Sequence, residues 1–168
     1  MKANANLILS PVIPWLLLAA LQGCHPNEQR LREIVREEIT AAATRTIITD
    51  PNTIGPYSPA QRIGNLLFVS GQIALDPRTG TLNNAGIEAE TRQALENLMR
   101  ILRSAGYDSS NVVSTTVYLR DIADYPKMNN IYGGYFAEGR YPARTTVQVG
   151  ALPREARVEI SAIAIKFS

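Results

Sequence analysis

The sequence has almost no cysteine or histidine. Among its 168 residues, Cys24 is the one cysteine and His25 the one histidine, and both stand near the N-terminus. From residue 26 onward the chain therefore cannot form a zinc site of Cys and His ligands, a Cys–His or Ser–His–Asp nucleophile system, or an intrachain disulfide. Any acid–base chemistry in that part has to come from Asp, Glu, Tyr, Lys or water.

An excess of charge of one sign is also absent. The chain has 17 Lys and Arg against 15 Asp and Glu, which gives a net charge of +2. Such a balance does not favour nucleic acid or an anionic membrane as a partner through bulk electrostatics. The length allows one domain of roughly 100 to 150 residues with its own core, and an additional segment.

The additional segment is N-terminal and contains an apolar run. Leu7 to Leu21 follow the basic Lys2, and Pro11 and Pro14 interrupt the run. The run is shorter than the about 20 residues that a membrane-spanning helix needs. A basic start, an apolar stretch and small residues at its end are typical of a secretory signal. We therefore predict export.

The end of this run, Leu21-Gln22-Gly23-Cys24, is similar to a bacterial lipobox, whose cysteine is lipidated and becomes the mature N-terminus. It predicts a signal peptide over residues 1–23 and a periplasmic protein of the bacterial cell envelope. Contact with the membrane would be made only through the lipid on Cys24. An uncleaved anchor, or a plain signal peptide that releases a soluble periplasmic or secreted protein, is the alternative interpretation.

Residues 24–45 are predicted to be a tether with a short amphipathic helix. Apolar residues recur there at helical spacing between charged ones, at Leu31, Ile34, Val35, Ile39 and Ala42. A solvated spacer is favoured over an address for a partner, and the stripe is too short to indicate a coiled coil.

Residues 46–168 are predicted to be one domain. Apolar, β-branched and turn residues predict strands at 45–48, 66–70, 111–119, 144–149 and 157–165, and helices at 87–105 and 125–138. Gly106 is a natural stop for the first helix, whereas Gly133 and Gly134 weaken the later part of the second. This order predicts an α+β fold, a two-layer sandwich of one mixed β-sheet with two helices on one face.

The other face of that sheet carries small and apolar residues too. In the last strand Val158, Ile160 and Ala162 lie on one side, and Ile163 and Ile165 on the other. A lone domain would leave the second face in water, so we predict an oligomer that buries it.

Charged residues inside the strands are rare. Among the acidic residues of the domain, Glu159 alone falls within an apolar strand, whereas the others, such as Glu90, are expected in loops, turns or helix surfaces. In the preceding strand, alternation puts Arg144 on one face with Thr146. If the two strands form a hairpin around 152–155, Arg144 and Glu159 could share a cleft. A cross-strand ion pair on an exposed sheet face, worth about 0.2–1 kcal/mol, is the competing interpretation.

Motifs along most of the domain resemble those of one known family. They are IGPYSPA (54–60), FVSGQIALDPRTG (68–80), QALENLMRIL (93–102), NVVSTTVYLRDIADY (111–125), MNNIYGGYF (128–136), YPARTTVQVGALP (141–153) and VEISAIAI (158–165). In their order and spacing they resemble the reactive intermediate deaminase family, RidA/YjgF. The resemblance implies a chorismate-mutase-like fold and a homotrimer with clefts between subunits.

The resemblance also implies two catalytic residues. Arg144, in the PAR motif, would hold the substrate carboxylate through two parallel charge-assisted hydrogen bonds. Glu159, in the VEI motif, would position and activate the water that adds to an imine carbon.

The other residues that the resemblance assigns to substrate binding are Tyr57, Ser70, Gly71, Asn129 and Thr146. Tyr57 would close over the cleft, and Ser70 and Gly71 would line it. Asn129 would lie near the ligand, and Thr146 stands where some members have a cysteine. A loop plug at Tyr57 and a helix-surface amide at Asn129 are the structural alternatives.

The predicted function is hydrolytic deamination of small reactive 2-imino or enamine acids to 2-oxo acids and ammonia, without a metal or organic cofactor. The alternative is a non-catalytic trimeric binding module for small carboxylate metabolites at the cell envelope, which would use the same cleft. A ribonuclease or chaperone-like activity, which the family also implies, is weaker. Near-neutral charge and the lack of a catalytic histidine argue against a nuclease.

Overall fold

The computed structural model describes residues 26–51 and 53–166. The predicted signal peptide and Cys24 lie outside the described residues and stay predictions. The chain divides into two units, Met1–Ala41 and Ala42–Ser168. Helix α2 (Pro26–Ala43) accounts for the described part of the first unit, and its Leu31, Ile34 and Ile39 are exposed. Within the described ranges, no helix is both long and apolar enough to cross a membrane.

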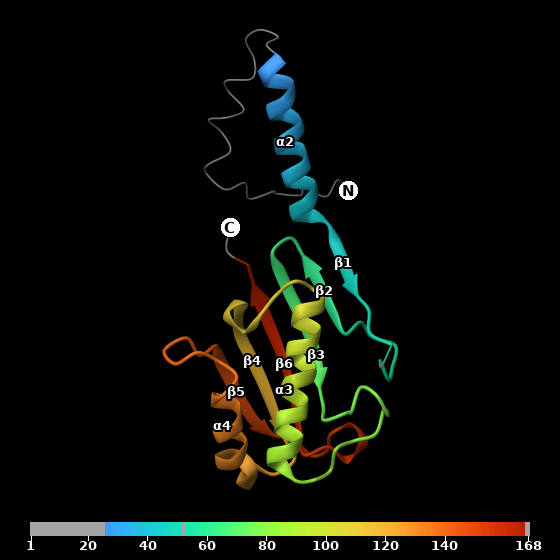
Figure 1. Ribbon diagram of the computed structural model, residues 1–168, viewed down its shortest axis with the longest axis vertical. Coiled ribbons are helices and arrows are strands. Elements are labelled where there is room, and N and C mark those ends of the chain that lie inside the picture. The colour runs from blue at the N-terminus through green and yellow to red at the C-terminus, as the bar shows by residue number, and fades with distance from the viewer. Residues whose placement is uncertain (1–25, 52, 167–168) are drawn as a thin grey trace, which may run out of the picture. The chain divides into compact units, whose positions relative to one another are not determined.

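The second unit is built on a six-stranded mixed sheet (Figure 1). Its strands are β1 (Arg45–Ile48), β2 (Ala60–Ile63), β3 (Leu66–Gln72), β4 (Val112–Leu119), β5 (Ala143–Gln148) and β6 (Val158–Ile165). Their order across the sheet is β1-β2-β3-β6-β4-β5. All neighbours are antiparallel except β4 and β5, which run parallel. β5 is therefore an edge strand, and β4 separates it from β6.

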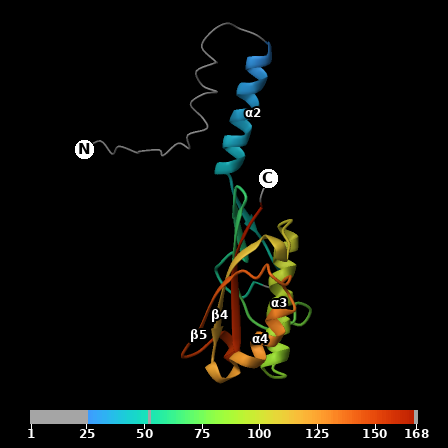
Figure 2. The ribbon, with the colours of Figure 1, turned by 90° about the vertical axis from the view of Figure 1, so that its left-hand side faces the viewer.

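Two helices, α3 (Ile87–Ser104) and α4 (Tyr125–Gly133), cover one face of this sheet and leave the other bare (Figure 2). Short 3₁₀ turns complete the connections at Ser109–Asn111, Ile122–Asp124 and Pro153–Glu155. The predicted fold, a two-layer α+β sandwich of one mixed sheet with two helices on one face, is confirmed.

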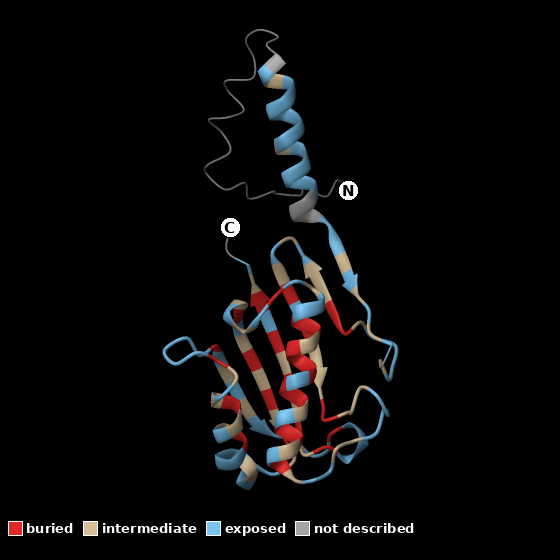
Figure 3. Cartoon of the chain, viewed as in Figure 1, coloured by how far each residue is buried: buried red, intermediate tan, exposed pale blue. Residues whose placement is uncertain are grey.

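The core lies between α3, α4 and the sheet, where buried residues alternate along β4 and β6 (Figure 3). Leu98 and Leu102 of α3 and Ile160 of β6 are fully buried, and each such side chain stabilises the fold by about 1.5–3 kcal/mol. Helix α3 ends at Ser104, one residue before the predicted end, and Gly106, the predicted stop, follows with φ 81°. The amide of the next residue, Tyr107, donates to Leu102 O at 2.8 Å, and this 6→1 bond closes the helix end.

Three details differ from the prediction. The strand β2 was not predicted, because its residues AQRI show no apolar alternation. Helix α4 is shorter than predicted and ends at Gly133, where two consecutive glycines make further helix costly. Strands β5 and β6 do not form a hairpin around 152–155, since β6 pairs with β3 and β4.

The bare side of the sheet, here called the open face, carries apolar side chains in contact with solvent. Phe68, Val147 and Ile163 are exposed to about 36–43%. Ser114 and Ser161 lie between them and line a hollow with Phe68 and Ile163. Exposed apolar residues gathered on one sheet face are typical of a surface that another protein covers.

Candidate functional site

Arg144 projects from the edge strand β5 toward the helix layer. It pairs with Thr115 of β4, which is buried under α4, and paired residues in a sheet share a face. One terminal nitrogen of Arg144, Nη2, donates to Asn129 Oδ1 at 2.7 Å and to Tyr125 Oη at 3.0 Å. The guanidinium carbon lies 4.4 Å from the ring centroid of Tyr132. Two hydrogen bonds and a cation–π contact therefore fix the guanidinium in place.

All three partners come from one side of α4. Tyr125, Asn129 and Tyr132 stand at i, i+4 and i+7, which is one face of a helix. The buried hydroxyl of Tyr132 pairs with Thr115 Oγ1 at 2.7 Å, and burial raises the pKa of Tyr132. Sequence reasoning identified Asn129 but missed both tyrosines, although this spacing was a signal for them.

Thr146 lies on the same face of β5 as Arg144. Its hydroxyl oxygen is buried and has no hydrogen-bond partner among the described residues. A buried polar atom without a partner is uncommon and points to a group that the chain itself does not supply.

Glu159 projects from β6 to the open face. Its neighbours Val158 and Ile160 are fully buried in the core, so alternation turns Glu159 the other way. The carboxyl is half-buried, and burial alone raises the pKa of Glu159. A carboxylate without a compensating cation keeps its basicity and can take up a proton at a pH where an ordinary glutamate is ionised.

Gly71 of β3 makes room for that carboxyl. A Cβ placed on Gly71 would collide with Oε1 of Glu159 and would also lie 2.6 Å from its Cδ. Glycine is thus required by space, because the Glu159 side chain lies directly over the main chain of β3. Any larger residue at position 71 would move the carboxyl.

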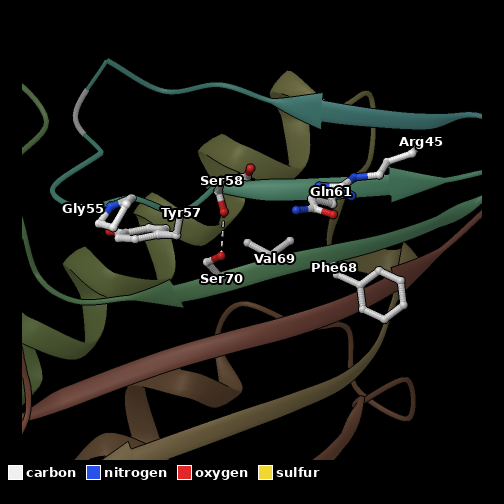
Figure 4. A pocket seen from close by; sticks show the side chains of 9 residues that line it. Arg45, Gly55, Tyr57, Ser58, Gln61, Phe68, Val69 and Ser70 are labelled. Carbon is white, nitrogen blue, oxygen red and sulfur yellow. Dashed lines mark hydrogen bonds between the residues drawn. The ribbon is translucent and has the colours of Figure 1, made fainter.

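Tyr57 and Ser70 line a hollow of about 750 Å³ on the open side of β2 and β3. Figure 4 shows Tyr57, Ser58 and Ser70 toward one end of it and Phe68 and Arg45 toward the other. The hydroxyl of Ser70 donates to Ser58 O at 2.7 Å, which ties the Tyr57 loop to β3. Tyr57 is 46% exposed, so it is accessible to a ligand.

Helix α3 contacts the Tyr57 loop and the end of β3 from the helix side of the sheet. Arg100 forms an ion pair of 2.6 Å with Asp50, at the start of the Tyr57 loop. Asn97 donates to the carbonyl oxygens of Ile73 and Leu75 at 3.0 and 2.8 Å and so fixes the chain after Gly71. One helix therefore positions both the loop and the end of β3.

The predicted site residues fall into two groups in one chain. Asn129 and Thr146 accompany Arg144 on the helix side of β5. Tyr57, Ser70 and Gly71 accompany Glu159 on the open side of β2, β3 and β6. A cleft within one chain that Arg144 and Glu159 share required a hairpin of β5 and β6, and that hairpin does not form. β4 lies between the two strands, and the two side chains leave the sheet on opposite faces. A cleft between subunits, as the family resemblance implies, stays a prediction.

One acidic residue was misplaced by sequence reasoning. Glu90, expected on a helix surface, is 2% exposed, and its Oε2 accepts the amide N–H of Arg157 at 2.8 Å. Burial raises the pKa of Glu90, although the Arg157 amide lowers it in part. Its place three residues after the buried Ile87 could have indicated an inward side chain. Glu90 of α3 thus binds the main chain just before β6 and links that strand to the helix.

A metal centre has no candidate ligand set here. Over residues 26–51 and 53–166, no three His, Cys, Asp or Glu side chains gather closely enough to hold an ion.

Residues 47–166 match the endoribonuclease L-PSP family. A RutC family protein of Pyrococcus horikoshii is 49% identical over 116 residues, which are 69% of this chain and 91% of that protein. The 2-iminobutanoate/2-iminopropanoate deaminase of Mus musculus is 50% identical over 116 residues, 69% of this chain and 85% of that enzyme. The crystal structure of E. coli TdcF with bound serine has a TM-score of 0.68 and 34% identity to this chain, and the match covers 73% of this chain and 99% of TdcF. The chain therefore belongs to the endoribonuclease L-PSP family, which includes the RidA and YjgF proteins.

Proposed function

We propose that this protein hydrolyses small reactive 2-imino and enamine acids to 2-oxo acids and ammonia. The observation that carries the proposal is the fixed guanidinium of Arg144, next to the unpartnered hydroxyl of Thr146. The deaminases of mouse and man, 50% and 47% identical to this chain, bear the names of 2-imino acids and support the substrate class.

In the first step Arg144 binds the substrate carboxylate. A planar guanidinium gives two parallel charge-assisted hydrogen bonds, so it sets the orientation of a small 2-imino acid as well as its position. The TdcF structure with bound serine supports a ligand with a carboxylate next to a nitrogen-bearing carbon. Thr146 supplies a hydroxyl on the same face of β5.

In the second step Glu159 takes a proton from water as the water oxygen bonds to the imine carbon. The electron pair of the C=N bond moves to nitrogen, which takes a proton from solvent, and a carbinolamine forms. Glu159 then returns its proton to the same nitrogen, while the hydroxyl gives its proton to solvent and its electron pair forms the C=O bond. The C–N bond breaks, and ammonia and the 2-oxo acid leave. Glu159 suits this proton transfer, because burial raises its pKa and makes its carboxylate a stronger base.

The two steps need two copies of the chain. Arg144 and Glu159 leave opposite faces of the sheet, so one chain cannot present both to one substrate. A homotrimer that buries the open faces would place Arg144 of one copy against Tyr57, Ser70, Gly71 and Glu159 of the next. The exposed apolar side chains of the open face support such an assembly.

The test is an imine assay. An amino-acid oxidase or a serine dehydratase generates the 2-imino acid, and its disappearance is followed with and without this protein. We expect the wild type to accelerate hydrolysis and Arg144→Ala to abolish the acceleration. No acceleration by the wild type, or an unchanged rate in Arg144→Ala, would refute the proposal.

A binding module for small carboxylate metabolites is the second candidate. The serine in the TdcF structure favours it, because serine is an amino acid and not an imine. Carboxylate binding that persists in Glu159→Gln, together with no turnover by the wild type, would establish a binder.

Export and lipidation of Cys24 form a separate proposal, which rests on the LQGC motif. Cells that express the chain should incorporate labelled palmitate, and Cys24→Ala should abolish the incorporation. A cytosolic protein with an intact Met1 would refute export.

A further inference from the structure

Both hydrogens of one terminal nitrogen of Arg144 are engaged before any ligand arrives. Nη2 carries two hydrogens, and two acceptors lie within hydrogen-bond distance of it, Asn129 Oδ1 at 2.7 Å and Tyr125 Oη at 3.0 Å. The other donors of the guanidinium are the two hydrogens of Nη1 and the one of Nε.

This arrangement conflicts with bidentate binding of a carboxylate. A carboxylate meets a guanidinium through two parallel N–H groups on neighbouring nitrogens. One such pair joins Nη1 and Nη2, and the other joins Nε and Nη2. Each pair uses a hydrogen of Nη2, so neither is free while Asn129 and Tyr125 both accept from that nitrogen.

The two acceptors are not equally easy to displace. Asn129 makes the shorter bond, and that bond is partly buried. Tyr125 makes the longer one in an exposed position, and its side chain is 37% exposed. A phenol oxygen is neutral, whereas a carboxylate makes a charge-assisted bond that is roughly twice as strong. A carboxylate can therefore replace the Tyr125 hydroxyl, which returns to solvent.

We propose that the Tyr125 hydroxyl is a displaceable cap on Arg144, and that it sets the affinity of the site for carboxylates. In the free protein it occupies the position that one carboxylate oxygen takes in the complex, while Asn129 stays bound to Nη2 in both states. The cap rests on the proposed function, since it presumes that Arg144 receives a carboxylate. It makes Tyr125 a determinant of affinity that acts through Arg144 and opposes binding.

The test compares Tyr125→Phe with wild type, using 2-oxobutanoate as the probe and calorimetry to measure its dissociation constant. Phenylalanine keeps the ring, whose centroid is 5.6 Å from the guanidinium carbon, and removes only the hydroxyl. We expect binding to become roughly 2- to 10-fold tighter, the worth of one hydrogen bond. Asn129→Ala should change affinity in the opposite direction, because that bond persists in the complex and orients Arg144.

Tyr135→Phe is the matched control. It removes the hydroxyl of a second, half-buried tyrosine, which donates to the main-chain oxygen of Arg92 at 3.3 Å and makes no contact with Arg144, so it should leave the dissociation constant unchanged. Unchanged or weaker binding in Tyr125→Phe, with binding in the wild type intact, overturns the cap alone. If neither the wild type nor Tyr125→Phe binds 2-oxobutanoate, both the proposed carboxylate site at Arg144 and the proposed cap are refuted.

Discussion

The Arg144 and Glu159 regions of the molecule are built in opposite ways. The Arg144 guanidinium makes two hydrogen bonds and a cation–π contact, all with side chains of α4. The Glu159 carboxyl lies against Gly71, and burial raises its pKa. No cation contributes to this shift. The first region suits the carboxylate binding that we propose, because its geometry exists before a ligand comes. The second suits the proton transfer that we propose, because no cation offsets the effect of burial on its carboxyl.

The two regions also differ in what they cost the stability of the fold. A partly buried carboxylate without a partner destabilises the folded state, whereas a hydrogen-bonded cation does not carry that cost to the same degree. Proteins keep such a group where function requires it. The changes below should separate binding from chemistry, from the largest effect to the smallest.

Removal of the Arg144 guanidinium should have the largest effect. In Arg144→Ala we expect kcat/KM to fall by roughly 100- to 1000-fold, as for loss of one partner of a hydrogen-bonded charge pair. Arg144→Lys should retain only a small part of the wild-type kcat/KM, because an ammonium group keeps the positive charge but lacks the two parallel N–H donors of a guanidinium. The imine assay measures both variants. Equal activity of the lysine variant and the wild type would show that charge alone suffices.

Glu159→Gln should lower kcat by roughly 100-fold and leave 2-oxobutanoate binding in place. A raised pKa means that the folded state favours the neutral acid. The stability from this preference is present at low pH and is lost as pH rises through the raised pKa. The melting temperature of Glu159→Gln should therefore increase relative to that of the wild type as pH rises. A decrease in this difference with rising pH would show that burial does not raise the pKa of Glu159.

Mixing the two inactive variants should restore activity. When Arg144→Ala and Glu159→Gln chains are unfolded together in equal amounts and refolded, random assembly into the proposed homotrimer gives about a quarter of the clefts an intact Arg144 from one copy and an intact Glu159 from the next. Each variant refolded alone is the control. No recovery in a mixture that has assembled would place both residues in a site within one chain.

Gly71→Ala should act on Glu159 and hence on kcat. The new Cβ collides with the Glu159 carboxyl, which has to move, so we expect roughly a tenfold loss of kcat and about 1–3 kcal/mol of destabilisation. Gly150→Ala is the control, since a Cβ there meets no atom within 4 Å. Unchanged kcat in Gly71→Ala would mean that the position of the carboxyl does not matter.

The smallest effect is expected from the ion pair behind the Tyr57 loop. Arg100→Ala and Asp50→Asn should each destabilise the fold by about 1 kcal/mol, since the arginine is partly exposed. KM should rise severalfold in both, because the loop that carries Tyr57 is held less firmly. Arg103→Ala, an exposed arginine on the same helix, is the control. A change in stability without a change in KM would limit the pair to a structural role.

Local patterns predicted most of the helices and strands, with β2 missed, but they could not predict which strands pair. Helix α3 begins at Ile87 and ends beside Gly106 as predicted, because both apolar periodicity and a C-terminal glycine are local signals. Alternation also placed Arg144 and Thr146 on one face correctly. The insertion of β4 between β5 and β6 has no local signal, so the sequence could not exclude the hairpin on which a cleft within one chain depended.

Side-chain partners were the other limit. Tyr125 and Tyr132 follow helical spacing, which normally indicates core packing, and their contact with Arg144 depends on how α4 lies on β5. Glu90 was expected on a helix surface, because its hydrogen-bond partner, the amide of Arg157, is distant in sequence. Both cases depend on contacts across the fold that no single segment contains.

The placement of Arg144 and Glu159 on opposite faces also determines when activity can begin. If the site forms only between copies, a newly made chain has every residue of the site and no complete site. Specific activity then depends on concentration: it falls on dilution, with a midpoint at the dissociation constant of the assembly. The open face, with Phe68 and Ile163, would thereby set the lowest concentration at which the protein is an enzyme at all.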